Sequence, residues 1–119
     1  MLMITGTLHL IATIFHFYWY IYELDNVIHF LGGAAISAFF LWLYFFSDFF
    51  NPPQKSLAKF LIVSILGAMF VAVSWEIFEL FLGEAMIQKT EYLYDTMMDL
   101  TMDFLGAVAL CFYGYLKNE

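Results

Sequence analysis

Long apolar stretches alternate with short polar breaks along the chain, and this pattern predicts membrane-spanning helices. A helix needs about 20 mostly apolar residues to cross the hydrocarbon core of a bilayer. Four stretches fit this requirement, at about residues 2–22, 27–47, 57–82 and 95–116. Because short connections join them, we expect a single domain over residues 1–119, an all-α integral membrane bundle of four antiparallel transmembrane helices.

The polar breaks indicate where these helices begin and end. Asn51-Pro52-Pro53 separates the second helix from the third, because proline stops a helix and restricts the residue before it. Asp25 stands in the polar corner before the second helix and is either its cap or a site residue. Asp95 and Thr96 can cap the fourth helix in a variant of the capping box that Asp99 completes.

Composition agrees with a membrane protein and excludes other classes. The 119 residues are 64% hydrophobic and 13% charged, whereas roughly a quarter of the residues in soluble domains are charged. The formal net charge is −7 and the chain has no basic stripe, so we expect no nucleic-acid partner. The single cysteine, Cys111, lies in an apolar run and is interpreted as a small buried residue.

Lysine placement predicts the orientation in the cell membrane, which is the plasma membrane or a bacterial inner membrane. Lys55 and Lys59 mark the second connection as cytoplasmic, because positive residues concentrate on that side. Lys117 places the C-terminus on the same side, whereas Lys89 opposes this assignment. With four crossings, both termini are then cytoplasmic.

Ionisable side chains fall inside the apolar stretches or at their rims. A carboxylate at the centre of a bilayer is unfavourable by about 2.5–3.5 kcal/mol on insertion scales, so such residues are functional candidates. The chain has no arginine that could neutralise them. The residues are His29, Glu76, Glu79, Asp95, Asp99 and Asp103.

Helix geometry predicts that most of these side chains share one layer. With a rise of about 1.5 Å per residue, all except Asp95 lie within roughly 12 Å of the same membrane boundary. Glu76 and Glu79 are three residues apart and the aspartates are spaced by four, so each set shares a helix face. His16 reaches a similar depth. The small residues Gly32-Gly33 and Gly106 let neighbouring helices approach closely.

Carboxylates with one or two imidazoles suit a divalent metal ion, namely Mg, Mn, Zn or Fe. We expect Glu79 to act as a general base or a fifth ligand. The Glu-x-x-His motif of soluble di-metal bundles is absent from the sequence. The expected ligands are His29, Glu76, Asp99 and Asp103, and additional candidates are His16, Asp25 and Asp95.

Three blocks of sequence carry a resemblance to a known family. They are Asp25-Asn-Val-Ile-His29-Phe-Leu-Gly-Gly33, Trp75-Glu76-Ile-Phe-Glu79 and Asp95-Thr96-x-x-Asp99-x-x-x-Asp103-x-x-Gly106. Their order and spacing resemble VanZ-like and YjdF-like small integral membrane proteins, from about residue 25 to 106. VanZ-type members often carry Gln and Asn at the positions of Glu79 and Asp103, so the chain is nearer the acidic YjdF-like pattern. The resemblance implies that the family motif positions are Asp25, His29, Glu76, Asp95, Asp99 and Asp103.

Three functions remain open at this point. The first is a metal site that acts on a membrane lipid or a lipid-linked head group. The second is an ion-coupled or proton-coupled carrier, in which the acids form a relay and the protein works as a homo-oligomer. The third is a non-catalytic subunit of a larger membrane complex, which small size and an aromatic surface that includes Phe45 would permit.

Overall fold

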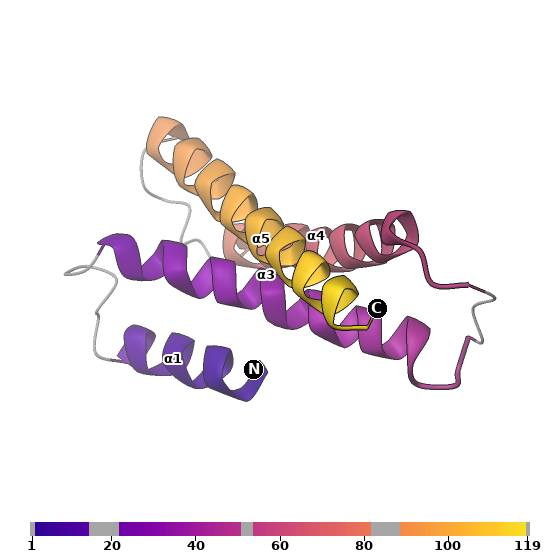
Figure 1. Cartoon of the computed structure of the whole chain (residues 1–119). Coiled ribbons are helices and arrows are strands. Elements are labelled where there is room, and N and C mark those ends of the chain that lie inside the picture. The colour runs from indigo at the N-terminus through magenta and orange to yellow at the C-terminus, as the bar shows by residue number, and fades with distance from the viewer. Residues whose placement is uncertain (1, 15–21, 51–53, 82–88, 119) are drawn as a thin grey trace.

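The computed structural model describes residues 2–14, 22–50, 54–81 and 89–118, and these form an elongated helical bundle. The helices are α1 (Leu2–Ile14), α3 (Tyr22–Phe45), α4 (Leu57–Phe81) and α5 (Lys89–Lys117). The principal extents of the bundle are 48 × 24 × 22 Å. α5 crosses α3 and α4 obliquely, whereas α1 lies alongside one half of α3 (Figure 1). The expected all-α fold with four helices is confirmed.

Three of the helices are long and apolar enough to cross a membrane, through Leu24–Phe45, Leu57–Phe81 and Leu93–Lys117. α1 has only 13 described residues, which is about 20 Å of helix against a hydrocarbon core of about 30 Å. The rest of the expected first span, residues 15–21, lies outside the described residues. The structure therefore supports three of the four predicted crossings.

Two helices begin earlier along the chain than the sequence predicted. α3 begins at Tyr22 instead of residue 27, and α5 begins at Lys89 instead of residue 95. Asp25 and Asp95 are therefore inside helices, and the prediction that they act as caps is wrong. The reason is that hydropathy marks only the apolar part of a helix. Lys and Glu are good helix formers, so the helices extend into polar flanking sequence.

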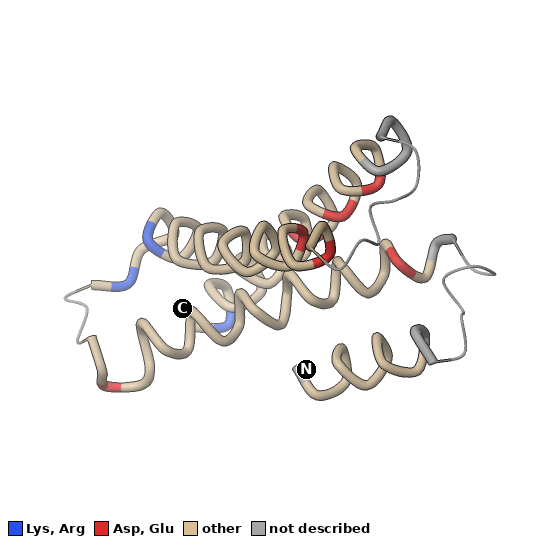
Figure 2. The backbone as a smooth tube through the Cα atoms, turned by 180° about the vertical axis from the view of Figure 1, so that it is seen from behind, with Lys and Arg blue, Asp and Glu red and all other residues tan. Residues whose placement is uncertain are grey.

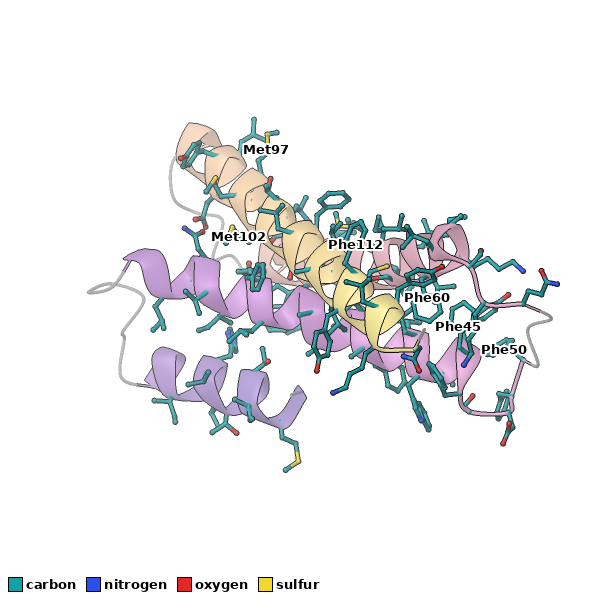
Figure 3. All side chains as sticks on the ribbon, in the orientation of Figure 1. Phe45, Phe50, Phe60, Met97, Met102 and Phe112 are labelled. Atoms are coloured by element: carbon teal, nitrogen blue, oxygen red, sulfur yellow. The ribbon has the colours of Figure 1, made fainter. Side chains whose placement is uncertain are left out.

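An aromatic core holds the helices together at one end of the bundle. Leu41 and Phe45 of α3 pack against Phe60 of α4 and Cys111 of α5. The rings of Phe45 and Phe60 stack with centroids 4.5 Å apart, and both side chains are labelled in Figure 3. Phe45 is buried, so its expected place on the lipid-facing surface is wrong, whereas Cys111 is buried as predicted. By contrast, Met97 on α5 is exposed.

Glycines bring the backbones of α3 and α5 into direct contact near the middle of the bundle. A Cβ atom added to Gly33 would lie 2.0 Å from the carbonyl oxygen of Asp103. A Cβ atom added to Gly106 would lie 2.0 Å from the carbonyl oxygen of Phe30. No other residue fits at either position without moving a helix. The predicted close approach at these glycines is confirmed.

Buried hydroxyl groups connect α3, α4 and α5 beside this crossing. Ser64 of α4 donates a hydrogen bond to the carbonyl oxygen of Ala107 at 2.9 Å, and its oxygen also contacts the hydroxyl of Ser37. A hydroxyl has one hydrogen to donate, so Ser37 donates to Ser64 when Ser64 donates to Ala107. Both serines are completely buried. These contacts link three helices, and they satisfy polar atoms that have no access to water inside a bilayer.

Charge is divided between the two ends of the bundle. The lysines drawn in blue lie in one half, the lysine end, and most of the described acidic residues lie in the other (Figure 2). Asp48 follows the end of α3, close to Phe46, over whose ring Lys55 lies. This division agrees with the predicted placement of the lysine end on the cytoplasmic side, although the orientation itself stays a prediction.

Candidate functional site

His29 is the centre of the acidic cluster, one helical turn after Asp25 on α3. Its Nδ1 atom lies 3.0 Å from Oδ2 of Asp103 on α5, at hydrogen-bonding distance. The glycine-mediated contact between α3 and α5 puts these two side chains opposite each other. When Nδ1 carries the proton and donates it to Asp103, the Nε2 atom of the neutral ring keeps its lone pair for another partner.

Two further carboxylates face that Nε2 atom. Oδ2 of Asp99 lies 3.5 Å from it and Oδ1 of Asp25 lies 3.8 Å from it. Both distances exceed the usual limit of about 3.2 Å for an N–H···O hydrogen bond. The three atoms from Asp25, His29 and Asp99 all lie within 4.8 Å of one another. The three atoms therefore lie close together, at ion-pair distance from His29, without hydrogen bonds between them.

The donor set fits a divalent metal ion. Metal–nitrogen and metal–oxygen bonds of about 2.1 Å in a tetrahedral site separate neighbouring ligand atoms by about 3.4 Å. The Nε2–Asp99 distance matches this value, and the Nε2–Asp25 distance is slightly longer. Asp99 is buried, and its Oδ1 atom makes no hydrogen bond within the described residues. A buried carboxylate oxygen of this kind is costly unless a cation or a proton satisfies it.

Glu76 and Glu79 occupy different surroundings on α4. Glu76 is buried, and its Oε2 atom accepts a hydrogen bond of 3.0 Å from the hydroxyl of Thr96 on α5. Oε1 of Glu79 accepts a hydrogen bond of 2.8 Å from the indole nitrogen of Trp75 on its own helix. Thr96 was expected to cap a helix, and its contact with Glu76 could be foreseen only from the packing of α4 against α5.

The additional candidates also differ in position. Asp25 joins the His29 group, with 28% of its side chain exposed. Asp95 is exposed on α5, one turn before Asp99, and interacts electrostatically with Asp25 and His29. His16 lies outside the described residues. The structure thus brings Asp25, His29, Asp99 and Asp103 together, with Glu76 and Asp95 beside them.

A cavity of about 220 Å³ adjoins the cluster between α1, α3 and α4. His29 and Asp103 form part of its wall, and Thr5 and His9 of α1 face it from the opposite side. The ring of His9 packs against Trp75 of α4 with centroids 5.2 Å apart. α1 therefore completes the wall of a hollow next to the polar site.

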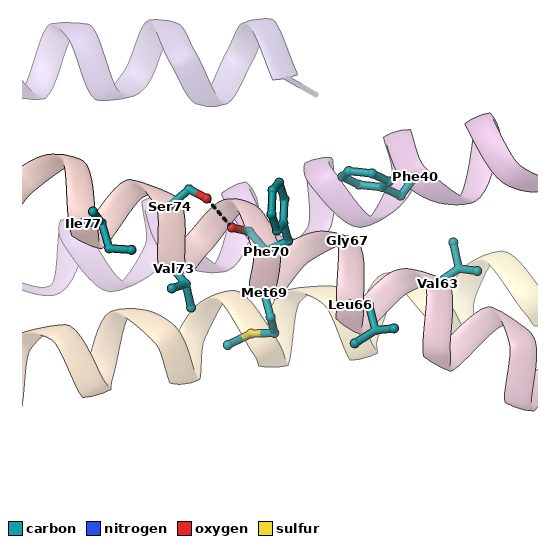
Figure 4. Close-up of a pocket in the computed structure, with 9 residues that line it drawn as sticks. All are labelled: Phe40, Val63, Leu66, Gly67, Met69, Phe70, Val73, Ser74 and Ile77. Carbon is teal, nitrogen blue, oxygen red and sulfur yellow. Dashed lines mark hydrogen bonds between the residues drawn. The ribbon is translucent and has the colours of Figure 1, made fainter.

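A larger hollow of about 840 Å³ lies along the outer face of α4, between Phe40 and Ile77 (Figure 4). Its lining is apolar except for Ser74, whose hydroxyl donates a hydrogen bond of 2.7 Å to the carbonyl oxygen of Phe70. Phe70 and Leu66 are largely exposed there. This surface suits contact with lipid chains and offers no group for chemistry.

Comparison with known proteins identifies the family of the chain. A family model described as "Predicted membrane protein (DUF2238)" matches residues 1–119. No curated protein and no solved structure that was compared matches the sequence. The match names neither VanZ-like nor YjdF-like proteins, so that resemblance stays a prediction. The match covers the whole chain, and the protein therefore belongs to the DUF2238 family of predicted membrane proteins.

Proposed function

We propose that the protein binds a divalent metal ion through Asp25, Nε2 of His29 and Asp99, and acts there on a lipid or lipid-linked head group. The observation that carries this proposal is the spacing around Nε2. Two carboxylate oxygens stand 3.5 and 3.8 Å away, too far for hydrogen bonds and at the separation of ligands that share one ion. Oδ1 of Asp99, which is buried and makes no hydrogen bond within the described residues, also supports binding of a cation by this group.

Asp103 is a positioning residue in this proposal, although the sequence suggested that it is a ligand. Its 3.0 Å contact with Nδ1 of His29 holds the ring and selects the tautomer that directs Nε2 toward the metal. Glu76, also expected to be a ligand, has one oxygen engaged by Thr96. The role of Glu79 as a general base stays a prediction, and its Oε1 atom accepts the hydrogen bond from Trp75.

The position of Asp25 supports a reaction at the membrane surface. Asp25 is in the first turn of α3, and its partly exposed side chain forms the open side of the cluster. A helix end of this kind lies near the boundary between hydrocarbon and head groups. A metal ion bound there would polarise a phosphoryl or ester oxygen and activate a water molecule. Imidazole and carboxylate ligands are compatible with Zn, Mn or Fe, and also with Mg.

Elemental analysis of the full-length protein, purified in detergent, tests the metal site. We expect about one equivalent of a divalent metal in the wild type and none in an Asp99→Asn variant, which loses a ligand. Asp48→Asn is the matched control, because Asp48 is exposed just after α3, at the opposite end of that helix from Asp25. Its φ of 59° is in the left-handed region, where asparagine is also well tolerated.

An Asp103→Asn variant separates positioning from direct ligation. Loss of a positioning group typically weakens metal affinity about 10- to 100-fold, so metal titration should recover full occupancy. If no divalent metal is present in the wild type and none binds on titration, the proposal is wrong. Protonated carboxylates would then explain the cluster, and a proton-coupled carrier or a subunit of a larger complex would become the leading function.

A further inference from the structure

The cavity beside His29 and Asp103 has an acidic side chain in its wall. Among the lining residues that the structure describes, Asp103 is the only one with a carboxylate, and none is Lys or Arg. Oδ2 of Asp103 is engaged by His29, whereas Oδ1 faces Gly32, 3.6 Å from where a Cβ atom would stand on that glycine. Gly32 also lines the cavity, so this oxygen lies at the cavity wall. A hollow with this charge favours a cation over an anion.

Trp75 gives the cavity an aromatic wall. Its indole nitrogen donates a hydrogen bond to Glu79, so the polar edge of the ring is already engaged and its apolar part lines the cavity. His9 packs against this ring at an interplanar angle of 86° and keeps it in place. An aromatic face near a carboxylate is the arrangement that recognises alkylammonium groups.

The size and the remaining lining restrict what fits. A volume of about 220 Å³ corresponds to roughly seven water molecules at about 30 Å³ each. It is below the range of about 300–1,000 Å³ typical of pockets for larger ligands, so it suits one polar group and not whole acyl chains. Ile28, Ile36 and Val71 supply apolar surface for methyl or methylene groups.

We propose that this cavity binds the ammonium group of a zwitterionic phospholipid. Asp103 supplies the counter-charge, Trp75 supplies the cation–π surface, and α1 forms the outer wall. The inference rests on the proposed function in one respect, because the lipid phosphate is then next to the group formed by Asp25, His29 and Asp99. It goes further by naming the head-group class, which is zwitterionic and not anionic.

The test measures binding of three probes to the full-length protein in an uncharged maltoside detergent, by isothermal titration calorimetry. The probes are a short-chain phosphatidylcholine, a phosphatidylglycerol with the same chains, and free choline. We expect phosphatidylcholine to bind about tenfold tighter than phosphatidylglycerol, because only the first carries the cation. Equal affinity for the two lipids would overturn the proposal. Equal affinity for choline and phosphatidylcholine would overturn the lipid assignment in favour of a free amine.

Gly6 allows the cavity to be filled without disturbing the cluster. It lines the cavity from α1, and a Cβ atom added there meets no atom within 4 Å. A Gly6→Leu variant should therefore fold, keep its metal and lose most of the phosphatidylcholine affinity. Gly114→Leu is the matched control, because Gly114 on α5 has equal space and is not a lining residue. Unchanged lipid affinity in Gly6→Leu would contradict the proposed pocket.

Trp75 provides a second variant that does not depend on filling the cavity. Trp75→Leu should weaken phosphatidylcholine binding about tenfold, and Trp75→Phe should restore much of it, because an aromatic ring is the required element. Equal affinity in the two variants would overturn the aromatic role. Failure of the metal site gives a different result. Metal would then be absent from the wild type and from every variant. Phosphatidylcholine would still bind tighter than phosphatidylglycerol, and Gly6→Leu would still abolish most of this binding.

Discussion

The two ends of the α3–α5 pair differ in the kind of side chain that lies between the helices. At the lysine end, Leu41, Phe45, Phe60 and Cys111 fill the space between helices with apolar side chains. Toward the acidic end, His29 meets three aspartates, and the glycine contact in the middle of the bundle brings the two helices close enough for this. The comparison indicates that packing energy is concentrated at one end, so that the other can hold polar groups at close range.

The largest effect should come from removing the close approach between backbones. A Gly106→Ala substitution would put a Cβ atom 2.0 Å from the carbonyl oxygen of Phe30 and so force α3 and α5 apart. We expect a loss of about 3 kcal/mol of stability, at the upper end for overpacked sites. Unfolding in a denaturing detergent, followed by circular dichroism, would measure it. Gly114→Ala is the control, and equal stability of the two variants would refute the contact.

An intermediate effect should come from the aromatic end. Phe60→Ala removes a side chain that is 1% exposed and stacks on Phe45. Separated helices stay in apolar lipid, so the cavity is the main loss, and we expect stability to fall by about 2–3 kcal/mol, less than the roughly 3–5 kcal/mol of this substitution in soluble cores. Metal content per folded molecule should stay the same, because the cluster lies at the opposite end. A variant that keeps its fold but loses its metal would show that the two ends are not independent.

The smallest effect should come from the buried hydroxyl groups between the ends. Ser64→Ala removes the hydrogen bond to the carbonyl of Ala107, while Ser37 stays close enough to that oxygen, at 3.4 Å, to replace it. Interhelical hydrogen bonds in membranes contribute about 0.6 kcal/mol on average, and we expect a loss of that size. A double-mutant cycle with Ser37→Ala would measure the coupling. A loss above about 2 kcal/mol would mean that the two hydroxyl groups supply a major part of the stability of the contact between α3, α4 and α5.

The sequence predicted the apolar helices well, because long runs without charge leave few alternatives. The start of the third helix at residue 57 is confirmed, and its predicted end, residue 82, lies outside the described residues. The starts of α3 and α5 were predicted too late, because Glu23 and Lys89 are polar but still compatible with helix. Whether the N-terminal segment crosses the membrane depends on residues outside the described range.

The sequence predicted which ionisable side chains lie close together, but not which of their atoms contact one another. Helical spacing correctly brought His29, Asp99 and Asp103 to one layer. It could not tell which nitrogen of His29 would face which aspartate, because that depends on the crossing of α3 and α5. The same limitation applies to Glu76, whose partner Thr96 became visible only once α4 and α5 were packed together.

The backbone contact between Gly33 and Asp103 also has a consequence for the order of assembly. It joins residues 70 positions apart, and the helix between them, α4, precedes α5 along the chain. In a membrane, helices insert first and associate afterwards. During synthesis α3 and α4 therefore enter the bilayer before the partner of His29 exists. The acidic site can therefore form only after α5 has been inserted, so an assembled site requires that α3, α4 and α5 are all in the membrane.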